Sequence, residues 1–281
     1  MAFAGSVDMT GICRPCLIEA STFLMKTILK RRLDALYLKY NRREFVSPDP
    51  LQFLYEYDDP ADREVVGLIA SSLAYGRVAQ IIRSVRSVLG RMAEPKKFVL
   101  ESTPAKLEKT FSGFKHRFTT GEEMAVMLAA AGRAIKKHGS LGRCFKSHVS
   151  RNDDTVLPAL AGFVSELGIG TSLLPCPDKK SACKRLNMYL RWMVRRDEVD
   201  PGGWDRISPA KLIVPLDTHM YQISKRLGFT SRKSADLRTA IEITAAFREI
   251  APDDPVRYDF ALTRLGIRSD LNVSAFLDSV L

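Results

Sequence analysis

The chain has 281 residues, of which 46% are hydrophobic and 27% charged, and its formal net charge is +11. This is ordinary globular composition, and the length suffices for one large domain or two small domains in close contact. This composition excludes extensive disorder and collagen-like repeats. A membrane bundle is excluded because the longest apolar run, 124–132, is too short to span a bilayer. The basic excess indicates nucleic acid as the first candidate partner and an anionic membrane surface as the second.

The cysteines are odd in number and no signal peptide is evident, which favours a reducing cytoplasm. Cys13 and Cys16 have the spacing of metal ligands, but a second pair with matching spacing is lacking. The four histidines form no metal-binding motif. We therefore predict no metal.

Residues 1–24 differ from the rest and are interpreted as an N-terminal extension or a wrongly assigned start. A domain spanning 25–281 follows. Apolar residues recur at helical spacing from Met25 to about Tyr40, and a loop then extends to Pro50.

The next elements are all predicted to be helical. Gly76 separates the first two of them, and no stretch alternates apolar and polar residues as a strand would. The expected helices cover 61–73, 78–92, a segment from 103, 121–137 and 158–167. The sequence therefore predicts an all-α fold of about ten helices without an obvious linker.

The segment 173–229 is the most informative part of the chain. Ser181 is a candidate N-cap for a helix over 183–196. At 100° per residue, its basic residues and a tryptophan gather away from the apolar face. Such a stripe suits a phosphate backbone and an exposed base, although a solvated helix face has the same pattern. The stripe comprises Lys184, Arg191 and Arg195, and Trp192 lies beside it with Arg185 and Arg196.

Asp217 precedes a predicted helix over 218–227 and is a natural N-cap, a purely structural role. A second interpretation joins it to Lys184. A lysine at a helix start is favoured as the neutral amine, which can form a Schiff base, and an aspartate at another helix start stays ionised. Such a carboxylate stabilises positive charge that develops on a sugar carbon.

These residues resemble the helix–hairpin–helix DNA glycosylase superfamily, in which a lysine at a helix start precedes an aspartate motif. Lys184 and Asp217 are 33 positions apart, a spacing similar to the archaeal 8-oxoguanine glycosylase branch. The matching segments are Leu174-Pro175, Lys180-Ser181-Ala182, Val214-Pro215-Leu216-Asp217-Thr218-His219-Met220 and Arg226-Leu227-Gly228.

The resemblance implies a two-lobed fold with a central cleft and an enzyme that removes damaged bases, such as oxidised purines, and nicks the abasic site. It implies double-stranded DNA as the partner, a monomer associated with the nucleoid, and no cofactor. Lys184 and Asp217 are the implied catalytic residues. The implied DNA contacts are Lys180, Arg185, Arg191, Arg195 and His219, and the implied base pocket contains Trp192, Tyr258 and Asp259.

The chain also departs from the superfamily. Residues 177–179 occupy the region where its hairpin glycines stand. A match without gaps selects Lys180 as the nucleophile, whereas the longer hairpin selects Lys184, which we prefer because it heads the basic stripe. Cys183 is the last cysteine, so the resemblance implies no iron–sulfur cluster. Asp253 or Asp254 is expected to cap the last helix.

Most of the chain is also similar to a widespread uncharacterised bacterial family, through motifs such as Leu73-Ala-Tyr-Gly-Arg77 and Asp254-Pro-Val-Arg-Tyr-Asp-Phe260. Two alternatives to the glycosylase remain. The first is a non-catalytic nucleic-acid-binding protein in which Lys184 contacts only phosphate. The second is an assembly protein whose charge serves RNA.

Overall fold

The computed structural model describes residues 14–168 and 173–267. These residues form twelve α-helices, four 3-10 turns and one pair of two-residue strands. The elements are α1 (Arg14–Tyr40), η1 (Arg43–Phe45), η2 (Pro50–Glu56), α2 (Pro60–Ser72), α3 (Val78–Leu89), α4 (Pro95–Glu101), α5 (Pro104–Phe111), β1 (Lys115–His116), β2 (Thr119–Thr120), α6 (Gly121–His138), α7 (Leu141–Ser147), α8 (Leu157–Leu167), η3 (Pro177–Lys179), α9 (Lys184–Val194), η4 (Pro209–Lys211), α10 (Thr218–Arg226), α11 (Leu237–Ile250) and α12 (Asp259–Ile267). The predicted all-α class is confirmed.

The helix ends follow local rules that are visible in the sequence. Thr120 and Glu123 form a capping box at the start of α6, and Gly139 ends that helix in the left-handed conformation. Asp59 and Thr103 cap α2 and α5, each followed by a proline that is compatible with the first helical turn.

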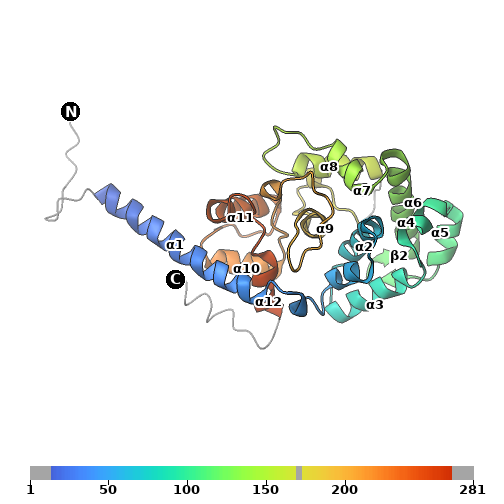
Figure 1. The fold of residues 1–281 in the computed structure, drawn as a ribbon, viewed down its shortest axis with the longest axis horizontal. Helices are drawn as coiled ribbons and strands as arrows, with labels where there is room; N and C mark the ends of the chain where they lie inside the picture. Colours follow the sequence, from blue (N-terminus) through green and yellow to red (C-terminus); the bar gives the residue numbers. More distant parts are fainter. Residues whose placement is uncertain (1–13, 169–172, 268–281) are drawn as a thin grey trace.

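Helix α9 lies in the middle of the molecule, as Figure 1 shows. Every residue from Leu186 to Val194 is buried. On one side α9 packs against α2, where Gly67 allows close approach, because a Cβ there would lie 3.0 Å from the Tyr189 ring. Helices α4, α5, α6, α7 and α8 continue from that side, whereas α1, α10 and α12 pack together on the other.

The boundaries of the first and last helices differ from those predicted. Helix α1 begins at Arg14 and not at Met25, where the helical pattern was expected to start; Pro15 stands in the first turn, where a helix tolerates proline. Residues 1–13, with Cys13, and the side chain of Cys16 lie outside the described part. Helix α12 begins at Asp259 and not after Asp254, whose carboxylate instead binds Arg195.

The sequence signals also missed the strand pair and three helices, α4, α7 and α11. β1 and β2 pair antiparallel around a two-residue turn, which is too short to show a period of two. No helix of the described residues is both long and apolar enough to cross a membrane.

Candidate functional site

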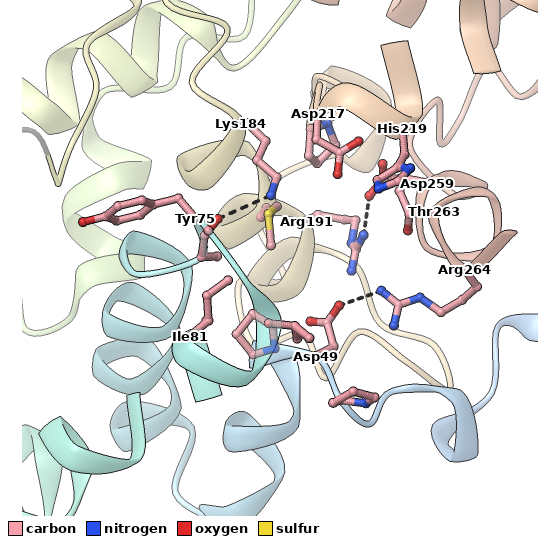
Figure 2. Close-up of a pocket in the computed structure, with 17 residues that line it drawn as sticks. Asp49, Tyr75, Ile81, Lys184, Arg191, Asp217, His219, Asp259, Thr263 and Arg264 are labelled. Carbon is pink, nitrogen blue, oxygen red and sulfur yellow. Dashed lines mark hydrogen bonds and ion pairs between the residues drawn. The ribbon is translucent and has the colours of Figure 1, made fainter. Parts of the chain in front are cut away.

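A cavity of about 390 Å³ lies where four helices begin. Its lining includes Val78 of α3, Lys184 of α9, Asp217 before α10 and Asp259 of α12, and each stands at the start of its helix. Figure 2 shows Lys184 and Asp217 along one side of the cavity and Asp49 on the opposite side. The two predicted catalytic residues therefore line the same cavity.

Lys184 is the first residue of α9 and is half-buried. Its Nζ donates to the carbonyl oxygen of Ala74, at 3.4 Å. Cys183 precedes it in the left-handed conformation, with φ 48°, and is buried. The predicted cap at Ser181 is wrong, because the Ser181 hydroxyl accepts a hydrogen bond from the backbone N–H of Cys183, before the helix begins.

Asp217 caps α10, as predicted, by accepting a hydrogen bond from the backbone N–H of Met220 through Oδ1, at 2.8 Å. The apolar segment before it, 212–216, is buried and anchors the start of the helix. Asp217 is half-buried, and the exposed side chain of His219 lines the same cavity. Oδ1 of Asp217 thus caps the helix, while the Asp217 carboxylate stays at the cavity.

Asp259 is 4% exposed and also lines the cavity. Its Oδ2 accepts from Arg191 Nη1, whereas Oδ1 has no hydrogen-bond partner among the described residues. Burial raises the pKa of the Asp259 carboxyl to about 6, and the nearby charge of Asp217 adds to that effect. Asp259 therefore lies in the same cavity lining as Lys184 and Asp217.

Lys180 lies in a neighbouring hollow of about 460 Å³, which it shares with Lys184 and Arg185, and it is not part of the lining around Asp217. Arg185 donates to the carbonyl oxygen of Ser72 at 2.7 Å, and its guanidinium lies 5.0 Å from the Tyr75 ring centroid. Burial lowers the pKa of Arg185. The position of the two lysines therefore favours Lys184 as the partner of Asp217.

The predicted exposed stripe on α9 is wrong beyond Arg185. Arg191 and Arg195 are each 4% exposed and form ion pairs within the protein. Arg191 binds Asp200 and Asp259, while Arg195 binds the carboxylates of three residues. Those three residues are Asp197, Asp200 and Asp254. Charges buried this deeply persist only when they are paired, so neither arginine is available to a DNA backbone.

Two base-pocket predictions are also wrong. Trp192 is fully buried in the core and does not line the cavity. Tyr258 is likewise fully buried, and its hydroxyl donates to Asp34 Oδ1 at 2.7 Å. Both side chains pack inside the protein, because large aromatic groups bury much apolar surface.

Sequence reasoning missed the floor of the cavity. Arg264 of α12 donates to Asp49 Oδ2 at 2.7 Å, and both residues line the cavity. Asp49 caps η2 and precedes Pro50, a signature that the sequence shows. Nothing in the sequence pairs Asp49 with Arg264, because 215 positions separate them.

Comparison with known proteins adds a family. The matching family is described as "Protein of unknown function (DUF2400)", and the match covers residues 49–268. The chain belongs to this family. The matched segment contains the cavity residues from Asp49 to Arg264. No curated protein and no solved structure matches the chain.

Proposed function

We propose that this protein is a DNA glycosylase with abasic-site lyase activity, acting on damaged double-stranded DNA. The observation that carries the proposal is that Lys184 and Asp217, each at a helix start, line one cavity. An amine and a carboxylate at one cavity are the two groups that base removal with strand cleavage requires. Oxidised purines are the first substrates to test.

In the proposed reaction, the Lys184 nitrogen forms a bond to C1′ while the glycosidic bond breaks and its electron pair leaves with the base. The Asp217 carboxylate stabilises the positive charge that develops on the sugar. A proton then passes from the amine nitrogen to the ring oxygen O4′, the C1′–O4′ bond breaks, and the nitrogen lone pair forms the C=N bond of a protonated Schiff base. Loss of a proton from C2′ then expels the 3′ phosphate oxygen, and this step nicks the strand.

The cavity is suited to an extruded base. Its volume, about 390 Å³, falls within the range of small-molecule pockets. Ile81, Met188 and Pro215 supply apolar walls, and the carboxylate of Asp259 supplies hydrogen-bond acceptors in the cavity lining. We assign base recognition to Asp259 in place of Trp192 and Tyr258.

Borohydride trapping tests the proposal. Labelled duplexes carrying 8-oxoguanine, uracil, thymine glycol or an abasic site are incubated with the protein and borohydride. We expect a covalent adduct that is lost in Lys184→Gln and retained in Lys180→Gln, a matched control from the neighbouring hollow. The lesion that gives the strongest adduct identifies the substrate class.

Other outcomes would redirect the proposal. An adduct lost in Lys180→Gln but kept in Lys184→Gln would move the nucleophile. Tight, salt-dependent duplex binding without any adduct would favour a protein that uses Lys184 only as a phosphate contact, or a glycosylase without lyase activity. Preference for RNA over duplex DNA in competition would select the RNA-assembly alternative.

A further inference from the structure

The turn between β1 and β2 presents an exposed aromatic side chain. Phe118 is 78% exposed, more than any other large hydrophobic side chain in the part of the chain that the structure describes. Arg117 precedes it with φ 53°, a left-handed conformation that is unfavourable for a side chain with a Cβ. A two-residue turn that holds a strained arginine and an exposed phenylalanine is poorly explained by packing alone.

The hairpin is attached to the rim of the cavity. The Tyr75 hydroxyl donates to the carbonyl oxygen of His116 at 2.8 Å and lies 2.7 Å from Thr119 Oγ1. In return, His116 Nε2 lies 3.1 Å from the Tyr75 carbonyl oxygen, while Nδ1 lies 2.9 Å from Ser84 Oγ. Because Tyr75 also lines the cavity, these contacts fix the position of the turn relative to Lys184 and Asp217.

Cationic side chains surround the hairpin. The Arg117 guanidinium lies 5.5 Å from the Phe118 ring centroid and 5.9 Å from that of Tyr75. Between α3 and β1 there is a hollow of about 330 Å³, lined by Arg83, Arg91 and Lys115 among other residues. None of the described residues that line this hollow is acidic. Its charge is therefore complementary to a phosphate backbone.

We propose that the hairpin Lys115–Thr120 is a DNA contact in which Phe118 stacks on a base beside the cavity. In this arrangement Arg83 and Lys115 bind backbone phosphates. Stacking on an aromatic side chain requires a base whose face is uncovered, and a duplex distorted at a lesion supplies one. The choice of a distorted duplex as the ligand rests on the proposed function.

The test measures binding without chemistry. The probe is a fluorescein-labelled duplex that contains a tetrahydrofuran abasic-site analogue, which cannot form a Schiff base. By fluorescence anisotropy we expect Phe118→Ala to bind about tenfold more weakly than the wild type, and Phe118→Trp to restore affinity. Leu38→Ala is the matched control, because Leu38 is 70% exposed and stands on α1, away from β2 in Figure 1. Its affinity should be unchanged.

Charge variants test the proposed binding of backbone phosphates by Arg83 and Lys115. Because each phosphate contact releases counterions, Lys115→Gln or Arg83→Gln should lower the slope of log affinity against log salt by about one. Unchanged affinity in Phe118→Ala, or absence of duplex binding by the wild type, would overturn the proposal. Tighter, Phe118-dependent binding to single-stranded RNA would overturn the assignment to DNA.

These outcomes are separable from those of the trapping experiment. A wild type that gives no borohydride adduct but whose duplex binding depends on Phe118 would retain the hairpin contact and lose the proposed catalysis. If the wild type gives the adduct but Phe118→Ala binds the duplex as tightly as the wild type does, the proposed catalysis is retained and the hairpin contact is lost. Thermal unfolding of Phe118→Ala checks that this exposed substitution leaves the fold intact.

Discussion

Lys184 donates a hydrogen bond through Nζ to the carbonyl oxygen of Ala74, at 3.4 Å. The contact joins the start of α9 to the corner between α2 and α3, and Arg185 makes a second contact to the same corner through Ser72. Carbonyl groups at a helix C-terminus attract cations, so this corner holds the side chain of Lys184 beside the cavity. The amine is thereby placed at the cavity before any substrate arrives.

Asp217→Asn should separate the catalytic from the structural role of this residue. The amide oxygen can still accept from the Met220 N–H, so the cap is preserved and the Tm should change little. Loss of the negative charge should lower the single-turnover cleavage rate by about 10²–10³-fold. The control is Asp59→Asn, which alters the cap of α2 away from the cavity. Unchanged cleavage in Asp217→Asn would leave this aspartate only its capping role.

Asp259 should give the reaction a dependence on mildly acidic pH. Burial raises the pKa of this carboxyl to about 6, so it is ionised at neutral pH and gains a proton as the pH falls through that value. Protonation removes a negative charge from a cavity in which positive charge develops, and cleavage should therefore slow below about pH 6. Single-turnover rates of Asp259→Asn should lack this inflection; a profile identical to the wild type would contradict the role.

Arg195→Met tests whether Arg195 stabilises the fold or binds DNA. The substitution leaves the carboxylates of Asp197, Asp200 and Asp254 without this partner, in or near the core. We expect the free energy of unfolding to fall by about 3–5 kcal/mol in a denaturant titration. At a temperature where the variant is folded, duplex affinity should be unchanged. The neighbouring exposed residue supplies the control Arg196→Met, which should unfold like the wild type.

Glu64→Gln should destabilise the contact between α2 and α7. The carboxylate accepts hydrogen bonds from the backbone N–H groups of Leu141 and Gly142 and from Trp204 Nε1, at 2.8, 3.1 and 2.9 Å. A glutamine presents one NH₂ group to these donors, so at least one donor loses its acceptor. The free energy of unfolding should fall by about 1–3 kcal/mol, measured by thermal unfolding. Exposed Glu108→Gln should have no effect, and an unchanged Tm in Glu64→Gln would mean that the site relaxes around the amide.

Local sequence patterns predicted most of the helices correctly. Caps and breakers act within a few residues, so Asp217, Thr120 and Gly139 could be recognised without knowledge of the fold. The pairing of Lys184 with Asp217 was predicted from their positions at helix starts and from a family resemblance, and both line one cavity.

The tertiary structure decided which basic residues face outward. Helical periodicity predicts the direction in which a side chain points from the helix axis, but it does not predict which side of the helix packs against another element. Arg191 and Arg195 lie on the polar side of α9, yet aspartates from the following loop and from residues 254 and 259 cover that side. The basic stripe is therefore a buried ion network, because the chain folds the loop after the helix and the distant residues Asp254 and Asp259 against it.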